Sequence, residues 1–491
     1  MIQKTLEEIR KTRLQKLKGL ETAGVLAYPA STKRTHRIIE ALDDFSVLAK
    51  SKKEVILAGR IRALRQHGKL TFLNIEDGSA KIQALLKENR LGEKGYAFFL
   101  KHFDIGDFVE LKGILFETKT KEKTIEVADY KMLAKSLLPL PEKWHGLQDE
   151  EEKLRKRYLD ILFNPEVKTM VEKKAVFWQS MREFLLARGF LEVETPVFET
   201  TPGGADARPF STHHNALDID VYLRISMGEL WQKRLMVAGL EKTFEIGRQF
   251  RNEGIDAEHV QDYTQMEFYW AYADYKDGMN LVEEMYRHVA KKTFGTLKFN
   301  IKGVEIDLGK KWERYDYREM VQKYAGVDVL DVGIKEIEAK LKKLNIEYDK
   351  EGFNLGRAMD NLWKYCRKKI VGPGFLINVP VTVSPLAKRC DKNPELTQRF
   401  QVIMAGSELG NGYSELNNPL EQAERFKEQQ KLREAGDEEA QMYDQDFVEA
   451  LEYGMPPTCG FGVSERFFSF LMGKPIRECQ VFPLLKPKQN S

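Results

Sequence analysis

The sequence of 491 residues has little cysteine, no long apolar run and almost no net charge. Its four cysteines, Cys366, Cys390, Cys459 and Cys479, are far apart and form no CxxC pair, which argues against a zinc site or a disulfide framework and favours reduced thiols in a cytoplasm. The N-terminus lacks the apolar segment of a signal peptide, and no run of about eighteen apolar residues occurs, so we expect neither export nor membrane insertion. A net charge of +3 is too small to predict DNA wrapping or membrane-surface binding.

The proportions of apolar and charged residues are typical of a globular protein, and one segment has a surplus of positive charge. Apolar residues account for 42% and charged residues for 31% of the chain, and its length suffices for about two or three domains. Residues 1–52 carry eleven lysines and arginines against six acidic residues. A phosphate-bearing partner and a solvated charged helix explain this surplus equally well.

Short strands dominate the chain after residue 54. The segment VILAGRIRALRQHGKLTFLNIEDGSAKIQALLK, which begins at Val55, is broken by HGK and EDGSA turns. With the following FDIGDFVELKGILFETKTKEKTIEVADYKMLAK it gives five strands within about eighty residues, which predicts a small barrel of the OB type. A β-sandwich is the alternative, but it usually needs more strands.

The remainder mixes long helices with aromatic-rich strands. VKTMVEKKAVFWQSMREFLLARGF predicts a helix that ends near Gly189, and FLEVETPVF predicts a strand in which Pro196 favours an edge or an interface. Residues 331–370 predict helices that form an insertion. The charged segment NPLEQAERFKEQQKLREAGDEEA predicts a solvated helix.

Two glutamates stand in the glycine-rich stretch GSELGNGYSELNNP, residues 406–419. Side chains alternate across a strand, so Asn411, Tyr413 and Glu415 should share one face while Glu408 points to the other. Because buried charges need partners, the segment predicts a bound cation, metal or ligand.

The segment EIGRQFRNEGIDAEHVQDYTQMEFYWAYADY, residues 245–275, predicts a long hairpin. Glu267 and Tyr269 share one face of its second strand, while Arg251, His259 and Tyr263 lie near its loop. An arginine, a histidine and an aromatic ring suit a phosphate chain and a stacked base. For the bare pattern, a surface hairpin with chance charges is the preferred explanation.

The order of the motifs makes the pattern specific. RGFLEVETPVFETTPGGADARPF, then FRNEGID, then GFGVSERFFSFL resemble the three signature motifs of class II aminoacyl-tRNA synthetases. The segments THHNALDIDVYLRIS, SPLAKR, ELGNGYSELNNP and ALEYGMPPT narrow the resemblance to the lysyl-tRNA synthetase family, over residues 55–487.

The resemblance implies an α+β protein that contains an N-terminal five-stranded OB-type β-barrel and a class II catalytic domain with an antiparallel sheet flanked by helices. The expected parts are an N-terminal helical extension (1–52), an OB-type anticodon-binding domain (53–136), a linker (137–155) and a catalytic domain (156–491) with a helical insertion near 331–370.

The resemblance also implies activation of L-lysine by ATP and transfer of the lysyl group to tRNA(Lys). Glu415 and Tyr269 would receive the ε-ammonium group of lysine, and Glu229 with the backbone of Gly204 would receive the α-ammonium group. A substrate with two positive groups and one negative group requires several acids and one arginine. The implied lysine-binding residues are Gly204, Glu229, Arg251, Glu267, Tyr269, Asn411, Tyr413 and Glu415.

For ATP, the resemblance implies that Arg251 is the catalytic residue, because it would bind both the α-phosphate and, with Asn411, the substrate carboxylate. Mg²⁺ would be held by Glu408 and by the residue at position 401. The implied ATP-binding residues are Arg251 at the α-phosphate, Glu253 at the adenine amino edge, Tyr263 and Arg466 on the two adenine faces, His259 at the terminal phosphate, and Glu408.

The chain departs from the family pattern at three places. Glu258 stands where the family usually has an arginine before the loop histidine, and Gln401 stands where it has a second metal-binding glutamate. The third motif, GFGVSER, is one residue shorter than usual. These changes affect the handling of ATP and leave the lysine pocket intact.

In the barrel, Arg65, Phe72 and Gln83 match anticodon-reading positions of related OB domains. Base–aromatic stacking contributes about 1–3 kcal/mol per base. The alternative for Phe72 is a place in the barrel core.

The implied partners are tRNA(Lys), ATP, L-lysine and a second copy of the chain, with no DNA and no membrane. The homodimer would use the first motif, because its helix and edge strand suit a two-fold contact. Two alternatives remain open. The first is a catalytically weakened, synthetase-derived tRNA-binding protein, and the second is an aspartyl- or asparaginyl-type synthetase, which would need a less acidic pocket.

Overall fold

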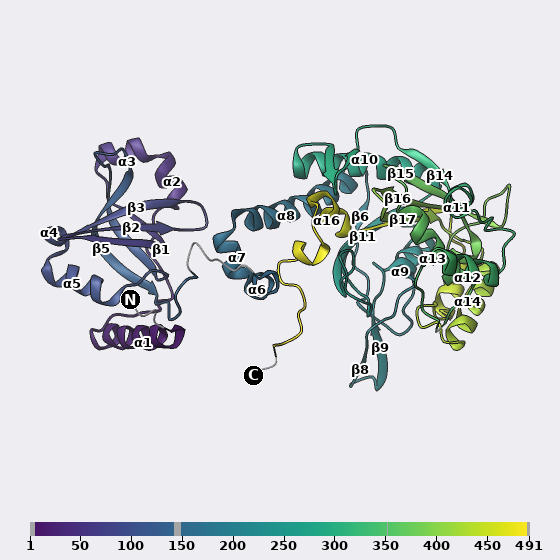
Figure 1. Ribbon diagram of the computed structural model, residues 1–491, viewed down its shortest axis with the longest axis horizontal. Helices are drawn as coiled ribbons and strands as arrows, with labels where there is room; N and C mark the ends of the chain where they lie inside the picture. Colours follow the sequence, from purple (N-terminus) through teal and green to yellow (C-terminus); the bar gives the residue numbers. More distant parts are fainter. Residues whose placement is uncertain (1–4, 142–148, 351, 489–491) are drawn as a thin grey trace. The chain divides into compact units, whose positions relative to one another are not determined.

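The chain divides into two compact units, residues 1–148 and 149–491, which are considered separately (Figure 1). The computed structural model describes residues 5–141, 149–350 and 352–488. Residues 142–148, part of the expected linker, lie outside the described residues, as do the first four residues of the expected N-terminal extension.

The first unit is built on a closed five-stranded barrel with the strand order β1-β2-β3-β5-β4, which confirms the OB-type prediction. The strands are β1 (Val55–His67), β2 (Leu70–Glu76), β3 (Lys81–Lys87), β4 (Phe108–Glu117) and β5 (Lys123–Ala134). The helices are α1 (Leu6–Thr22), α2 (Ile38–Asp43), α3 (Phe45–Ser51), α4 (Glu88–Leu91) and α5 (Glu93–His102).

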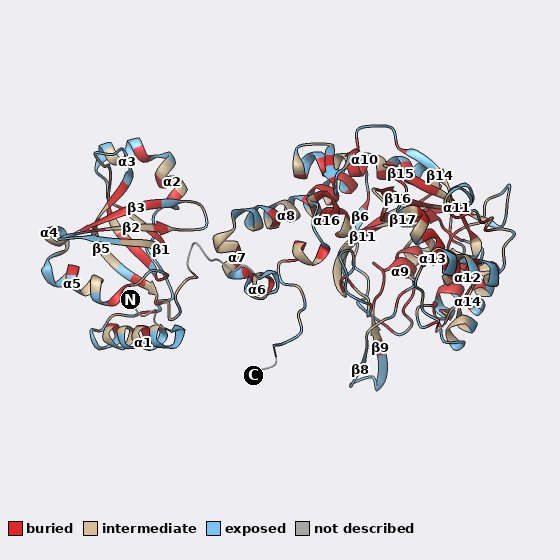
Figure 2. Ribbon diagram, in the orientation of Figure 1, coloured by how far each residue is buried: buried red, intermediate tan, exposed pale blue. Residues whose placement is uncertain are grey.

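Every second side chain along the barrel strands points inward and fills the barrel core. Leu73 and Ile75 of β2 are buried in the barrel core, whereas Phe72 and Asn74, which alternate with them, are only partly buried. The same alternation is visible as red and tan bands along the strands in Figure 2.

The second unit contains an eight-stranded sheet with the order β14-β15-β16-β17-β18-β11-β10-β6. Its pairs are antiparallel except for β14 with β15 and β10 with β6, so the antiparallel prediction is confirmed. The strands are β6 (Leu191–Glu192), β10 (Lys242–Phe250), β11 (Asp262–Ala271), β14 (Glu313–Asp316), β15 (Gly374–Pro380), β16 (Leu396–Met404), β17 (Ser407–Ser414) and β18 (Thr458–Ser464).

Smaller sheets and helices complete this unit. The smaller sheets consist of β7 (Phe198–Glu199), β8 (Ser211–His214) and β9 (Ile219–Leu223), and of β12 (Lys298–Ile301) and β13 (Val304–Asp307). The helices are α6 (Glu150–Arg155), α7 (Arg157–Phe163), α8 (Pro165–Leu186), α9 (Glu229–Val237), α10 (Tyr275–Phe294), α11 (Tyr317–Ala325), α12 (Ile334–Lys343), α13 (Leu355–Arg367), α14 (Pro419–Glu434), α15 (Gln445–Glu452) and α16 (Arg466–Met472), with short 3₁₀ turns at Val381–Val383 and Ile476–Cys479. The helices expected in 331–370 are therefore α12 and α13.

The two faces of the large sheet have different neighbours. On β11, Met266 and Phe268 enter a core that also contains apolar residues of α8, α10 and α16. Glu267 and Tyr269 alternate with them and face the opposite side, toward α9. One face of the sheet thus supports the fold, and the other is free to carry polar groups.

The segment FLEVETPVF is less regular than expected. It forms only the short strands β6 and β7, and Pro196 lies between them because proline has no N–H to donate to a sheet ladder. In the part of the chain that the structure describes, no helix has the length and apolar character needed to cross a membrane. The four cysteines are free.

The core beneath the sheet is sensitive to loss of an aromatic ring. Phe177 of α8 is fully buried and contacts the rings of Trp178, Phe467 and Phe468 edge-on, with centroids 5.0–5.7 Å apart. We expect Phe177→Ala to lower the free energy of unfolding by about 3–5 kcal/mol, because the truncation leaves a cavity. Urea unfolding of the full chain, followed by tryptophan fluorescence, measures this loss.

The matched control is the neighbouring side chain. Val176 is 41% exposed, so Val176→Ala should change the same free energy by less than about 0.5 kcal/mol. Equal effects of the two substitutions would contradict the assignment of α8 to the core.

Candidate functional site

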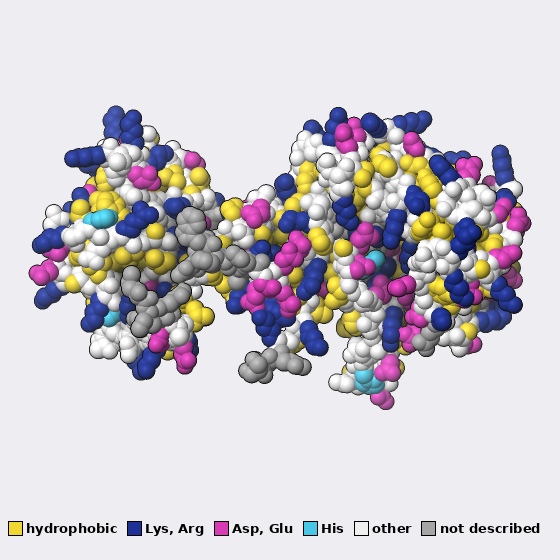
Figure 3. Space-filling model, viewed as in Figure 1, with side chains coloured by type: hydrophobic (Ala, Val, Ile, Leu, Met, Phe, Trp, Pro, Cys, Tyr) yellow, Lys and Arg dark blue, Asp and Glu magenta, His cyan; other side chains and the backbone are white. Residues whose placement is uncertain are grey.

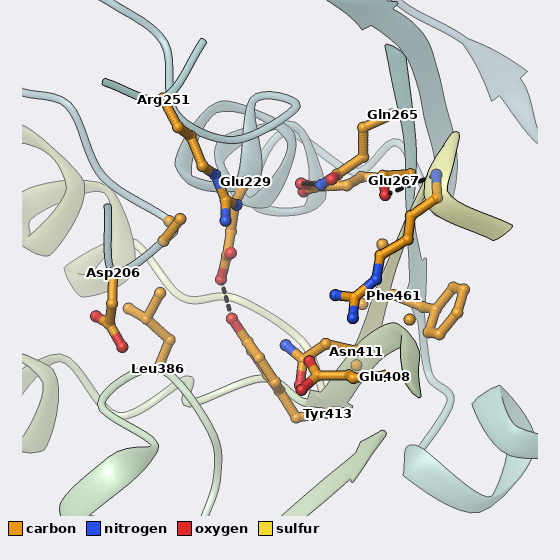
Figure 4. A pocket seen from close by; sticks show the side chains of 18 of the residues that line it. Asp206, Glu229, Arg251, Gln265, Glu267, Leu386, Glu408, Asn411, Tyr413 and Phe461 are labelled. Carbon is orange, nitrogen blue, oxygen red and sulfur yellow. Dashed lines mark hydrogen bonds between the residues drawn. The ribbon is translucent and has the colours of Figure 1, made fainter. Parts of the chain in front are cut away.

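A cavity of about 310 Å³ opens on the polar face of the large sheet. Its floor is made by β11, β17 and β18, and its walls by the start of α9 and the loop between β10 and β11. An adjoining cavity of about 490 Å³ shares Arg251, Glu253 and His259 with it. Figure 3 shows acidic and histidine side chains around a hollow in this unit, and Figure 4 shows the lining in detail.

The position of Glu408 corrects a prediction from simple alternation. Asn411, Tyr413 and Glu415 line the cavity as expected, but Glu408 lines it too instead of pointing to the other face. The reason is a β-bulge: Gln401 pairs with Asn411 while Ile403 pairs with Glu408, so β17 has one extra residue between these pairs. The bulge shifts the alternation and turns Glu408 toward the cavity (Figure 4).

A buried lysine of the chain itself lies among the acids. Lys233 on α9 is 1% exposed, and its Nζ lies 2.6 Å from Glu229 Oε1 and 2.6 Å from Glu415 Oε2. The Tyr413 hydroxyl donates a hydrogen bond to Glu229. Sequence reasoning missed Lys233, although its spacing of four residues from Glu229 on one helix was a readable signal.

Glu267 is held by three hydrogen bonds. Its Oε1 accepts from the Met227 amide at 3.0 Å and from Gln265 Nε2 at 2.6 Å, and its Oε2 accepts from the Tyr269 hydroxyl at 2.9 Å. Gln249 Nε2 in turn donates to Gln265 at 3.0 Å. This network fixes the orientation of the Glu267 carboxylate, and its two glutamines were not anticipated from the sequence.

Burial changes the protonation of these acids. It raises the pKa of Glu267 to about 7, with the nearby Glu229 charge acting in the same direction. Burial also raises the pKa of Glu415 well above its ordinary value, although the Lys233 ammonium group opposes this shift. For Lys233 itself, burial disfavours the charge, but Glu229 and Glu415 outweigh it and raise the pKa. Glu229 and Glu415 thus share one ammonium group, and the raised pKa values of Glu267 and Glu415 favour their protonated forms near neutral pH.

Two glycines make room for this arrangement. A Cβ on Gly460 of β18 would collide with the Glu415 carboxylate and the Tyr269 ring. Gly204 has φ of +86°, and a Cβ there would lie 2.6 Å from Ser226 Oγ and 2.7 Å from Glu229 Cβ. A side chain at either position would therefore fill the acidic end of the cavity.

Arg251 projects into the same cavity from the end of β10 (Figure 4). Its Nε donates to the Ile225 carbonyl at 3.2 Å, and its guanidinium lies 5.9 Å from the centroid of the Tyr263 ring. Burial alone disfavours the charge of Arg251, but Tyr263 and nearby carboxylates raise its pKa above the ordinary value. Arg251 therefore presents a permanent positive charge to the cavity.

Asn411 is not free to bind a ligand through its oxygen. Its Oδ1 accepts a hydrogen bond from Arg399 Nε at 2.8 Å. The NH2 group of the same side chain takes no part in that bond. Arg399, which sequence reasoning did not single out, lines both cavities and lies opposite Tyr413 in the β16–β17 pair.

The expected ATP residues gather at the opposite end. Glu253, His259 and Tyr263 line the cavity, and His259 Nδ1 lies 2.8 Å from Asp256 Oδ2. The Tyr263 hydroxyl accepts from Gln249 Nε2 at 2.5 Å, which connects this end to the Glu267 network.

Charged groups at this end are paired with one another. The Glu258 carboxylate contacts Arg466 at the start of α16 and accepts from Ser407 Oγ at 2.8 Å. Glu408 Oε2 lies 3.2 Å from Arg367 Nη1. Burial lowers the pKa of Arg466 to about 10, which is still high enough to keep it charged at neutral pH. Arg367 was not anticipated from the sequence.

The oxygen donors at Glu408 and Gln401 suit Mg²⁺ only weakly. Gln401 is buried, and within the described residues its Oε1 has no hydrogen-bond partner, so this oxygen is available as a ligand. Among those residues, no cluster of three or more His, Cys, Asp or Glu side chains has the geometry of a metal site. One carboxylate and one amide oxygen fit a Mg²⁺ ion that takes most of its ligands from phosphates and water.

On the barrel, Arg65 and Phe72 pair across β1 and β2, and Asn74 pairs with Gln83 of β3. Phe72 lies outside the barrel core and meets the His67 ring edge-on at 6.3 Å. The three expected anticodon residues therefore share the outer face of neighbouring strands, where Gln83 Oε1 also accepts from Thr124 Oγ1 at 2.9 Å.

Comparison with known proteins gives concordant matches for the two units. The family model of class II tRNA synthetases (D, K and N) matches residues 149–486, and the OB-fold nucleic acid binding domain matches residues 55–133. The chain is 43% identical to the lysine–tRNA ligase of Thermosipho africanus over 98% of this chain and 97% of that protein. It is 43% identical to that of Thermotoga maritima and 46% identical to that of Thermoanaerobacter pseudethanolicus, each over 99% of this chain and 97% of the relative.

Removing the buried ammonium group tests the electrostatics of the acidic end. We expect Lys233→Met to lower the free energy of unfolding by about 3–5 kcal/mol, because it leaves buried carboxylates without their cation. Urea unfolding of the full chain at pH 8 measures the change.

Lys342→Met is the matched control. Lys342 on α12 also pairs with a glutamate one helical turn away, Glu338, at 2.7 Å, but its side chain is 64% exposed. Its loss should cost less than about 1 kcal/mol. Similar losses for the two variants would mean that Lys233 does not neutralise the pocket.

Proposed function

The chain belongs to the class II lysine–tRNA ligases, and we propose that the acidic end of its 310 Å³ cavity binds L-lysine and the opposite end binds ATP. The enzyme activates lysine with ATP to lysyl-adenylate and transfers the lysyl group to tRNA(Lys).

Charge balance is the observation that carries the assignment of the acidic end. Glu229, Glu267 and Glu415 contribute three negative charges when ionised, and Lys233 returns one positive charge. The remaining charge of −2 matches the α- and ε-ammonium groups of one lysine molecule. A neutral or acidic amino acid would leave buried carboxylates unpaired, and polar sites of this kind discriminate by about 10⁴ or more.

The depth of each group suggests its role. Glu415 and Tyr269 are almost fully buried at the floor of the cavity and suit the ε-ammonium group. Glu229 and the Gly204 backbone lie together at the wall and suit the α-ammonium group. Glu267 adds charge between them, and Tyr413 holds Glu229 in place.

Arg251 links the two substrates. It presents a fixed positive charge to the cavity and would hold the α-carboxylate of lysine, together with the Asn411 amide, against the α-phosphate of ATP. The carboxylate oxygen attacks the α-phosphorus in line, pyrophosphate leaves, and lysyl-adenylate forms. Positioning and charge neutralisation supply most of the catalysis in such transfers.

The remaining ATP contacts follow from the second end of the cavity. Tyr263 and Arg466 would enclose the adenine ring, Glu253 would accept from its amino group, and His259 would reach the terminal phosphate. Glu408 and Gln401 would hold Mg²⁺, which when bound neutralises charge on the phosphate oxygens.

The barrel would read the anticodon of the tRNA. Arg65, Phe72 and Gln83 on its outer face offer a cation, an aromatic ring and an amide to unstacked bases. The second reaction step is attack by a terminal ribose hydroxyl on the carbonyl carbon of the adenylate, which releases AMP.

Exposed apolar residues at the first motif support a homodimer. Leu191, Val197 and Phe198 are 51%, 39% and 56% exposed, and β6 is the edge of the large sheet. A two-fold contact would cover these side chains and the strand edge. We infer a cytoplasmic location, because translation enzymes of this kind typically work there.

ATP–pyrophosphate exchange measured with each standard amino acid tests the proposal. Exchange that depends on lysine alone is expected. Exchange with aspartate or asparagine would favour those synthetase types, although the acidic cavity does not suit them. No exchange with any amino acid would indicate a tRNA-binding protein without activity.

Neutralising Glu415 should weaken lysine binding selectively. We expect Glu415→Gln to lower lysine-dependent exchange by roughly two to three orders of magnitude, because truncating one partner of a buried charged contact costs about 2–5 kcal/mol. The KM for ATP should change little. Glu428→Gln, in an exposed position on α14, should leave exchange unchanged. Wild-type exchange in both variants would remove Glu415 from the lysine site.

Lysine binding should release protons near neutral pH. The pKa of Glu267 is about 7 in the empty cavity, and that of Glu415 is also raised. An ammonium group placed beside them favours their ionised forms, so lysine lowers both pKa values and its affinity falls as the pH drops below about 7. Calorimetric titration at pH 6.5 in two buffers of different ionisation enthalpy measures the released protons.

The control for this titration is Glu267→Gln, which removes one titrating group. The number of protons released should decrease in the variant. Identical binding heats for the wild type in the two buffers would contradict coupled deprotonation.

A further inference from the structure

The ATP end of the cavity contains an ion-pair cluster whose cation comes from the helical insertion. Glu258, in the loop between β10 and β11, and Glu408, at the bulge of β17, both line the cavity. Arg367, the last residue of α13, lies behind them: its Nη1 is 3.2 Å from Glu408 Oε2, and its Nη2 is 3.9 Å from Glu258 Oε2. One guanidinium group therefore faces both carboxylates.

The location of Arg367 is fixed by the backbone. After α13 the chain runs beside the turn between β16 and β17, where the Ala405 amide donates to the Val371 carbonyl at 2.6 Å and the Gly406 amide donates to the Ile370 carbonyl at 2.9 Å. Gly406, with φ of +75°, permits this approach. The same turn leads directly to Ser407, which donates to Glu258, and to Glu408. These hydrogen bonds thus fix the end of α13 relative to Glu258 and Glu408.

The charges of the four side chains in this cluster sum to zero. Glu258 and Glu408 are negative, while Arg367 and Arg466 are positive. Arg367 is only 12% exposed at its side chain, so water screens its attraction to the carboxylates weakly. Without Arg367 the cluster would have a net negative charge where a triphosphate, itself strongly negative, has to bind.

The residues around the ATP end explain why the positive charge of Arg367 is needed. The loop brings a carboxylate, Glu258, to the ATP end, and β16 brings the neutral Gln401 to the adjoining cavity. A carboxylate in the loop repels the terminal phosphates unless a nearby cation neutralises it. The groups that face Glu258 are Ser407, Arg466 and Arg367. Of the two arginines, Arg466 is the one assigned to the adenine ring.

We propose that Arg367 is a positioning residue for ATP, which neutralises Glu258 and Glu408 and holds both carboxylates so that the triphosphate and its Mg²⁺ ion can bind beside them. This inference rests on the proposed location of ATP in the cavity. Arg367 lines neither cavity and acts through the two carboxylates. It thereby compensates for the acidic residue in the loop.

The proposal predicts a selective defect in Arg367→Ala. The KM for ATP in lysine-dependent exchange should rise by roughly tenfold or more, because contacting charged residues couple by about 0.5–3 kcal/mol, whereas the KM for lysine should stay within about twofold. The Mg²⁺ concentration needed for half-maximal exchange should also rise. Calorimetric titration with a non-hydrolysable ATP analogue, at several Mg²⁺ concentrations and without lysine, gives the affinity independently of turnover.

Charge reversal separates this role from a purely structural one. Arg367→Glu should weaken binding of the ATP analogue more than Arg367→Ala does, because three carboxylates then meet. Combining it with Glu258→Arg restores an opposite pair and should recover at least part of the affinity. Recovery of the melting temperature without recovery of ATP affinity would overturn the proposal. Arg367→Lys keeps the positive charge and serves as the test variant if the other substitutions prevent folding. It should bind the analogue more tightly than Arg367→Ala or Arg367→Glu.

The matched control is Arg318→Ala on α11. Arg318 forms a two-point pair with Asp328 in the same helical region, but it lines neither cavity. Its loss should leave the KM for ATP unchanged. If Arg367→Ala also leaves the KM for ATP and the Mg²⁺ dependence unchanged while the wild type is active, this inference is wrong. If the wild type itself shows no lysine-dependent exchange, the proposed function fails instead.

Discussion

The rest of the site depends on the contact between Lys233 and the carboxylates of Glu229 and Glu415. Burying several carboxylates in one cavity is costly unless a cation accompanies them. One ammonium group from α9 offsets only part of the negative charge of Glu229, Glu267 and Glu415, so the cavity is short of positive charge. Burial raises the pKa values of Glu267 and Glu415, and at Glu415 the Lys233 ammonium group opposes this shift without cancelling it. If lysine binds as proposed, the same shortage gives the cavity its selectivity, because a ligand with two ammonium groups supplies the missing positive charge.

The large sheet makes this arrangement possible by separating its two faces. Met266 and Phe268 anchor β11 in a packed aromatic core, so the residues between them project in a fixed direction. A site built on packed strands is held more tightly than one built on loops. Gly460 contributes because it has no side chain. Any side chain there would occupy the space of the Glu415 carboxylate. Catalytic geometry thus follows from packing on the opposite face.

Period-two alternation and turn residues were sufficient to predict much of this fold from the sequence. They gave the barrel strands, the β10–β11 hairpin and the shared face of Glu267 and Tyr269. They failed at Glu408, because one extra residue in β17 shifts the alternation without leaving a mark in the sequence pattern. Lys233 was missed because a lysine in a short helix is usually solvated, and its burial depends on β17, which comes much later in the chain. Arg367 was missed for the same reason, since its partners come from two distant segments.

Both ends of the cavity follow one electrostatic rule. At each end the chain brings carboxylates to the surface of the cavity and neutralises them from behind with a cation that lies outside the recognisable motifs. Lys233 does this at the lysine end and Arg367 at the ATP end. The two cations belong to different helices, α9 and α13, and have no carboxylate partner in common. A change of charge in the loop at Glu258 can therefore be balanced locally, while the acids that select lysine keep their own neutralising group.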